Sequence, residues 1–150
     1  MRRALLPMLV LLSLPARLAG QTELMTRAYE QERRSDFNGA AEAYLQVLRQ
    51  YPGNLSALLG LERALTPLHR EAELAGPAEA FLAHEPANVA GYSVAMRGWA
   101  AASRPDSVAE VAKRWAVIEP GSETPYREWG NTLLGQQDGN GARRAYLAGR

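Results

Sequence analysis

Prolines recur along this sequence at a constant spacing of 34 residues, and each is followed two residues later by a small polar residue. The three pairs are Pro52 with Asn54, Pro86 with Asn88, and Pro120 with Ser122. Proline cannot continue a preceding helix, and Asn or Ser at an N-cap accepts a hydrogen bond from a free backbone N–H of the helix that follows. A fixed period of this length predicts a chain of repeated structural units.

Each 34-residue interval contains two stretches in which apolar residues recur at helical spacing. In the first interval a turn at residues 35–39 separates a stretch around Leu24 and Ala28 from a stretch around Tyr44 and Val47. We therefore expect four two-helix units at about residues 21–54, 55–88, 89–122 and 123–150. The expected core positions in the first helices of the later units are Leu58, Leu61 and Leu65, then Tyr92, Ala95, Met96 and Trp99, and then Tyr126, Trp129, Gly130 and Leu133.

These units resemble the tetratricopeptide repeat (TPR) family. The matching residues are Phe37, Ala40, Tyr44 and Pro52 in the first unit and Tyr126, Trp129, Gly130, Ala142 and Tyr146 in the fourth. The resemblance covers about residues 22 to 150. It implies an all-α fold, a right-handed α-solenoid of about four TPR units with a concave face formed by the first helices. A two-helix hairpin cannot bury both of its apolar stripes alone, so neighbouring units are expected to stack.

The second and third units depart from this pattern. Because proline suits the first turn of a helix, we expect the second helix of the second unit to begin near Pro67 and to kink or break near Pro77. By the same argument Pro105 marks the start of the second helix in the third unit.

The first twenty residues have the order of a secretory signal peptide. Arg2 and Arg3 precede a mostly apolar stretch at residues 4–14, and Ala19 and Gly20 are the candidate cleavage positions. The apolar stretch is shorter than the roughly 20 residues that a membrane-spanning helix needs. We expect an exported protein, periplasmic or secreted, with no transmembrane segment in the mature chain.

Composition also narrows the class of protein. The formal net charge is +1, and removal of Arg2, Arg3 and Arg17 with the signal would change it to −2. No run of basic residues indicates binding to nucleic acid. A hydrophobic content of 47% and a net charge near zero are typical of a folded chain and not of a disordered one.

No set of residues with catalytic or metal-binding spacing is present. The sequence has no cysteine, which excludes disulfides, thiolate metal sites and cysteine nucleophiles. The two histidines, His69 and His84, lack metal-site spacing and are expected on helix surfaces. The glycines between Gly135 and Gly141 do not follow a strand, so a nucleotide site there is not expected. We expect no enzyme, no catalytic residue, no metal and no cofactor.

The candidate site is a peptide-binding groove. In the TPR family the concave face uses fixed positions of each first helix, and this implies a groove lined by Tyr29, Arg63, Arg97, Arg127 and Asn131. Arginine binds carboxylates through two parallel hydrogen bonds, so the expected ligand is an acidic segment or the C-terminal carboxylate of an extended peptide. The alternative is that the arginines pair with Glu30, Glu62 or Glu128 and bind nothing.

The leading hypothesis is a non-catalytic protein-protein interaction scaffold of the cell envelope. Two alternatives remain open. One is an exported N-terminal repeat region of a larger enzyme or assembly factor, because the fourth unit has no polar helix behind it and terminal repeats need a polar outer surface. The other is a module that stacks end to end on copies of itself through that fourth unit.

Overall fold

The computed structural model describes the backbone of residues 14–150 and the side chains from residue 20 onward. Within residues 14–150 the chain forms eight α-helices, joined in four hairpins, and no strand. They are α1 (Leu14–Arg33), α2 (Phe37–Gln50), α3 (Leu55–Leu65), α4 (Ala75–His84), α5 (Val89–Ala101), α6 (Pro105–Ile118), α7 (Thr124–Gly135) and α8 (Gly139–Ala148).

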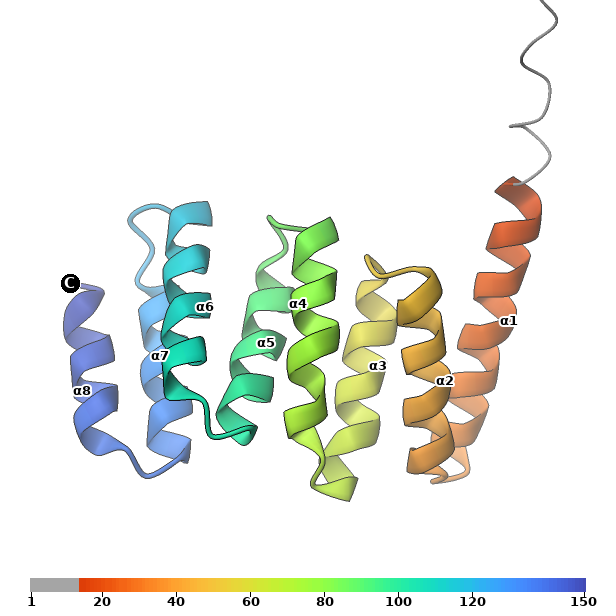
Figure 1. Ribbon diagram of the computed structural model, residues 1–150, viewed down its shortest axis with the longest axis horizontal. Helices are drawn as coiled ribbons and strands as arrows, with labels where there is room; N and C mark the ends of the chain where they lie inside the picture. Colours follow the sequence, from red (N-terminus) through yellow and green to blue (C-terminus); the bar gives the residue numbers. More distant parts are fainter. Residues whose placement is uncertain (1–13) are drawn as a thin grey trace, which may run out of the picture.

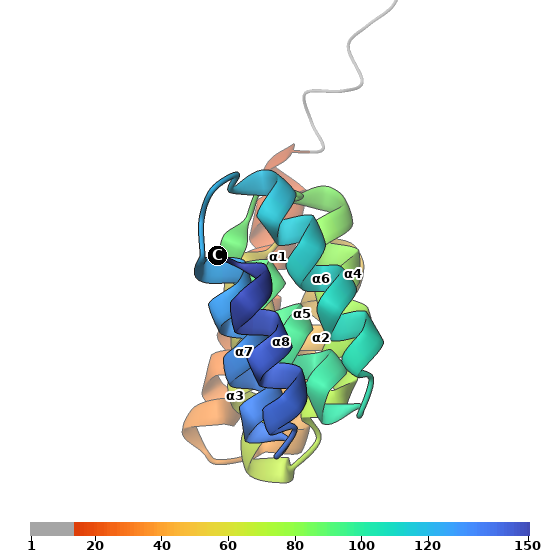
Figure 2. The ribbon, with the colours of Figure 1, turned by 90° about the vertical axis from the view of Figure 1, so that its left-hand side faces the viewer.

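The hairpins stand side by side in a row from α1 to α8 (Figure 1). Viewed along the row, α4 and α6 lie on one side and α3 and α7 on the other (Figure 2). Neighbouring first helices contact one another, α1 with α3, α3 with α5 and α5 with α7, and α2 contacts α4, so the first helices form one layer and the second helices the other. Below, the surface of the first layer is called the A-helix face and that of the second layer the B-helix face.

The turns within the hairpins repeat with the period of the sequence. Each contains one residue with a left-handed backbone, and none of the four is glycine. These residues are Ser35, His69, Ser103 and Gln137, with φ of 59°, 54°, 56° and 63°. In each turn the N–H of the next residue donates to the carbonyl oxygen five positions earlier, at 2.9 to 3.2 Å. This is a Schellman end to each first helix, and it fixes the direction of the second.

The first two turns between hairpins have the geometry expected from the sequence; in the third, Glu123 and not Ser122 is the N-cap of α7, and its side chain does not cap the helix. The helices α2, α4 and α6 end two residues before Pro52, Pro86 and Pro120. Asn54 is the N-cap of α3, and its side chain accepts from Ala57 N at 2.9 Å. Asn88 caps α5 in the same way. Capping of this kind satisfies N–H groups that no helical carbonyl can reach.

The second hairpin corrects two expectations. Pro67 does not begin the second helix: it lies in a 3₁₀ turn, Thr66–Leu68, that follows α3. Pro77 does not kink a helix either, because it lies in the first turn of α4, where no N–H is needed. The missing N–H of Pro77 prevents a regular α-helix from starting earlier, so the chain forms a 3₁₀ segment, Glu71–Leu74, before α4 begins. Pro105 does begin α6, as expected.

A continuous core joins the first three hairpins. Its buried side chains run from Ala28 on α1 to Trp115 on α6. A smaller cluster formed by Leu133, Ala142 and Ala145 lies within the fourth hairpin, and Trp129 packs against both clusters. The fourth hairpin is thus attached to the rest of the row through fewer fully buried side chains.

The predicted signal peptide lies largely outside the described residues. Residues 1–13, which include both N-terminal arginines, are not described, and α1 begins at Leu14, within the predicted segment. None of the helices in residues 14–150 combines the length and apolar character needed to cross a membrane.

The left-handed turn residues lead to a stability prediction. Ser103→Gly should raise the free energy of unfolding by roughly 0.5 to 1 kcal/mol, because glycine has no Cβ to oppose a positive φ. Ser107→Gly is the matched control, since Ser107 lies inside α6 and the same change should destabilise by a similar amount. Urea unfolding followed by circular dichroism measures both. A loss of stability in both variants would contradict the prediction.

Candidate functional site

The five residues predicted for the groove lie on the four first helices. Tyr29 is on α1, Arg63 on α3, Arg97 on α5, and Arg127 and Asn131 are both on α7. All five side chains are exposed. The row of helices therefore places one or two of them on each unit of the A-helix face.

The two central arginines are already paired with glutamates of the preceding unit. Arg63 donates to both carboxylate oxygens of Glu32, through Nε at 2.7 Å and Nη2 at 3.0 Å. Arg97 does the same to Glu62, at 2.5 and 3.0 Å. The arginine side chains are 51% and 47% exposed, whereas the glutamates are 21% and 20% exposed. Each pair is thus half open to solvent and links neighbouring first helices.

These contacts match part of the alternative considered from the sequence. Glu62, one of the three glutamates named as possible partners, pairs with Arg97. Arg63 pairs instead with Glu32, which was not among them. Each guanidinium leaves its Nη1 group without a hydrogen bond to the described residues. An arginine has five N–H donors, so a carbonyl oxygen of a ligand can bind Nη1 without breaking the ion pair.

A buried tyrosine extends the first pair into the core. The Tyr44 hydroxyl donates to Glu32 Oε2 at 2.6 Å, and the side chain of Tyr44 is fully buried. The hydrogen bond from Arg63 lowers the pKa of Glu32, more than partial burial raises it. Burial first, and then the bond to Glu32, raise the pKa of Tyr44 well above its usual range. The group is therefore a charged pair with a neutral donor beneath it.

The lowered pKa of Glu32 predicts an acid-dependent loss of stability. A carboxyl whose pKa is lower in the folded state stabilises the fold above its unfolded pKa, and that contribution disappears as pH falls through the folded value. Between about pH 5 and pH 3, the wild-type protein should lose more unfolding free energy than Arg63→Gln, in which Glu32 has no cation. Urea unfolding across this range measures the difference. Parallel pH curves would contradict the assigned cause.

A hollow of about 450 Å³, called here the α5–α7 hollow, lies between α5 and α7 near the predicted residues. Met96 and Ala100 give it an apolar lining, and Gly135 leaves it open at the end of α7. Arg97 and Asn131 also line it, so the structure brings these two predicted residues together. An apolar hollow with a few polar groups is a usual form of a ligand-binding site.

Two further hollows lie on the A-helix face, one toward each end of the row. A hollow of about 620 Å³ between α1 and the start of α3 is lined by Tyr29 and Met25. Another of about 630 Å³ at the C-terminal end is lined by Arg127, Asn131 and Tyr146. Tyr146 donates to Asn131 Oδ1 at 2.7 Å. Arg63 lines none of these three hollows. On α3, it lies between the hollow beside α1 and the α5–α7 hollow.

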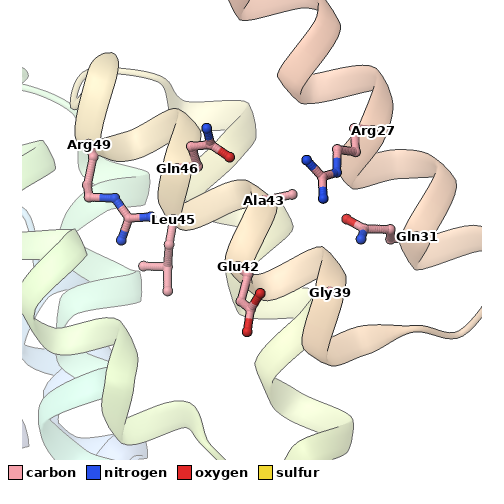
Figure 3. A pocket seen from close by; sticks show the side chains of 8 residues that line it. All are labelled: Arg27, Gln31, Gly39, Glu42, Ala43, Leu45, Gln46 and Arg49. Atoms are coloured by element: carbon pink, nitrogen blue, oxygen red, sulfur yellow. The ribbon is translucent and has the colours of Figure 1, made fainter.

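Hollows that no sequence pattern predicted lie away from the A-helix face. Between α1 and α2 lies a polar hollow of about 230 Å³, the α1–α2 hollow. Arg27 and Gln31 point from α1 toward α2, whereas Glu42, Gln46 and Arg49 come from α2 (Figure 3). The buried Gln31 Oε1 has no hydrogen-bond partner among the described residues. The available signal in the sequence was the spacing of three polar residues, Glu42, Gln46 and Arg49, along α2.

Within residues 14–150 no group of three or more His, Asp or Glu side chains is placed to hold a metal ion. His69 is an exposed turn residue, and His84 Nδ1 lies 3.0 Å from the carbonyl oxygen of Ala80.

Solved structures of MamA have a similar arrangement of helices. A crystal structure of MamA matches 86% of this chain and 70% of its own, with a TM-score of 0.63 and 18% identity. MamA from Desulfovibrio magneticus RS-1, from residue 41 to its end, matches 86% and 73%, with a TM-score of 0.60 and 15% identity. A second crystal structure of MamA matches 81% and 71%, with a TM-score of 0.59 and 17% identity.

The chain has a helical-repeat fold like that of MamA, which is consistent with the TPR resemblance. At these identities the similarity shows the fold alone. No protein-family model matches the sequence, and no curated protein matches it. The arginines, Asn131 and the hollows must therefore be interpreted from this chain's own geometry, because one fold serves many specificities.

Proposed function

We propose that this protein is a non-catalytic interaction module that binds an extended segment of a partner protein along its A-helix face. The observation that supports this most directly is the α5–α7 hollow, where an apolar floor lies beside Arg97 and Asn131. On this proposal the A-helix face is the concave face of a right-handed solenoid. The row of three hollows gives an extended peptide successive places for its side chains.

The chemistry of the face favours recognition of a peptide backbone together with one apolar side chain. Arg97 keeps free N–H donors beside its ion pair, and the amide N–H groups of Asn131 are free among the described residues. Both can donate to backbone carbonyl oxygens of a bound peptide. An apolar side chain of the peptide would fill the hollow above Met96.

One arginine of the A-helix face is the best candidate to bind an acidic residue of the partner. Arg63 and Arg97 each have a carboxylate already, so a further acid gains little there. Arg127 forms no ion pair with the described residues and lines the last hollow of the face. We therefore place an acidic residue of the partner at Arg127.

Export to the periplasm or outside the cell is part of the same proposal. It rests on the order of charges and apolar residues before Gly20. Fusion of residues 1–30 to a reporter that is active only after export tests it directly. A reporter that stays inactive, while a known signal peptide activates it in the same cells, would contradict this part of the proposal.

A blocked hollow tests the binding face. Gly135 lines the α5–α7 hollow, and a Cβ there would meet no atom within 4 Å, so Gly135→Trp can fill the hollow without disturbing the helix packing. A photo-reactive residue at Ala101 would identify the partner segment in an extract of the host's cell envelope. The synthetic segment should then bind Gly135→Trp at least about tenfold more weakly by fluorescence anisotropy, as expected for one lost anchor side chain.

Gly139→Trp is the matched control. Gly139 is the first residue of α8, and a Cβ there also meets no atom within 4 Å. It lines none of the hollows of the A-helix face, so its variant should bind as the wild type does. Unchanged binding by Gly135→Trp, or equal losses in both variants, would contradict the proposed face.

A further inference from the structure

The B-helix face carries an apolar cleft that the proposed function does not use. It lies between α2 and α4, encloses about 380 Å³ and is called here the α2–α4 cleft. Its walls are mainly apolar. They are formed by Leu45, Leu48, Pro52, Pro77 and Ala80.

The neighbouring pair of units shows why this cleft is open. One unit further along the row, α4 and α6 are joined by an ion pair in which Arg114 Nη2 lies 2.7 Å from Glu79 Oε1. The residues 34 positions before this pair are Leu45 on α2 and Ala80 on α4. These side chains cannot form an ion pair, so at the first junction the bridge is replaced by an apolar gap. Gly76 keeps the gap open, because a Cβ there would meet no atom within 4 Å.

One uncompensated cation lies at the edge of this gap. Arg49 lines both the α2–α4 cleft and the α1–α2 hollow, and it lies beside Leu45 on α2 (Figure 3). It forms no ion pair with the described residues, in contrast to Arg63, Arg97 and Arg114. An arginine without a carboxylate is the better place for an incoming anion, because no internal pair has to be broken.

The other charged residues around the cleft do not change the expectation that an anion binds at Arg49. His84 lines the cleft opposite Arg49. Glu42 lines the α1–α2 hollow, two turns of α2 before Arg49, and its charge also acts on Arg70. The α1–α2 hollow holds Arg27 as well. The anionic group of a ligand is therefore expected at Arg49, where the two hollows meet. Glu42 and Gln46, in the α1–α2 hollow, would accept hydrogen bonds from the N–H groups of the same ligand.

We propose that the α2–α4 cleft binds the C-terminal residue of a partner polypeptide, with its apolar side chain in the cleft and its terminal carboxylate on Arg49. Leu45 and Arg49 are four residues apart on one helix, so the cleft and the cation lie about one helical turn apart. A C-terminal residue carries an apolar group and a carboxylate at a comparable separation. The preceding residues of the ligand run along the α1–α2 hollow, where Gln46 meets their backbone. This site is independent of the A-helix face.

The experiment is an NMR titration of the ¹⁵N-labelled protein with two N-acetylated Ser-Ala-Gly-Leu peptides, one with a free carboxylate and one with a C-terminal amide. The free acid should shift the amide signals of residues on α2 and α4. The amide should bind about tenfold more weakly, as for one lost charge-assisted contact. Arg49→Gln should bind the acid as weakly as the wild type binds the amide, and it should no longer distinguish the two peptides.

Two further variants separate this site from the A-helix face and from misfolding. Gly76→Leu fills the cleft in a place where a Cβ meets no atom, so binding of the acid should fall while the helical circular dichroism remains. Gly135→Trp, on the opposite face, should bind both peptides as the wild type does. The proposal is overturned if acid and amide bind equally, if no peptide binds at millimolar concentration, or if the shifts fall on α5 and α7. Shifts on α2 and α4 that depend on protein concentration alone would assign the cleft to a second copy of the chain and would overturn it too.

Discussion

Gly98→Ala should be among the most destabilising single-methyl changes in this protein. A Cβ at Gly98 on α5 would lie 2.6 Å from the backbone nitrogen of Ala75 and 3.0 Å from the carbonyl carbon of Leu74. Both atoms belong to backbone at the start of α4, so no side-chain rotation can relieve the contact. We expect a loss of about 3 kcal/mol of unfolding free energy, because α4 and α5 must separate to admit the methyl group. Urea unfolding followed by circular dichroism measures it.

Gly135→Ala provides the control for this prediction. Both glycines lie in first helices, α5 and α7, but a Cβ at Gly135 meets no atom within 4 Å. Alanine also has the higher helix propensity, by up to about 1 kcal/mol. The control should therefore be as stable as the wild type or slightly more stable. If both variants unfold at the same urea concentration, the close approach of α4 and α5 does not limit stability.

The second large effect is expected at the aromatic residue of α2. Tyr44 is fully buried, its ring covers Gly60 of α3, and its hydroxyl bonds Glu32. Tyr44→Ala should lower the free energy of unfolding by about 4 kcal/mol, since it leaves a cavity between the first two hairpins and removes the donor from a partly buried carboxylate. Tyr44→Phe keeps the ring and should cost about 1 kcal/mol, which isolates the contribution of the hydrogen bond.

Tyr146 occupies the same place in the fourth hairpin and serves as the internal comparison. Its ring covers Gly130 as that of Tyr44 covers Gly60, but it is only half-buried and belongs to the smaller cluster. Tyr146→Ala should therefore cost about 2 kcal/mol or less. Equal losses at the two positions would show that the fourth hairpin is as firmly packed as the first, against the division of the core described above.

The helices and their ends could be predicted closely because the causes are local. Pro52, Pro86 and Pro120 act on the helix immediately before them, and Asn54 and Asn88 cap the helix immediately after. The prediction failed at Pro67 and Pro77. Proline is compatible with the first turn of a helix and with a turn that ends one, and the sequence alone does not say which applies. The packing of Leu74 against α5 and the closure of the hairpin decide it.

The candidate site was only partly accessible to sequence reasoning. The 34-residue register puts Tyr29, Arg63, Arg97 and Asn131 at equivalent positions of successive units, and the TPR resemblance implied that this position lines the groove. Register could not say that Glu32 would be the partner of Arg63, since the two are 31 residues apart and meet only through the stacking of α1 and α3. The register also did not predict the cleft on the B-helix face. That cleft exists because Leu45 and Ala80 stand where the next unit has the ion pair of Glu79 and Arg114.

The sequence by itself determined the helical repeat and the length of its unit, and it identified the residues that start and stop most of the helices, because these depend on backbone conformation and hydrogen bonding within a few residues. Only the tertiary structure decided which charges are neutralised, which aromatic rings lie against glycines, and where hollows remain between helices. Those properties arise from distances between residues about 30 positions apart. Such distances are set by the packing of whole hairpins and not by any local preference of the chain.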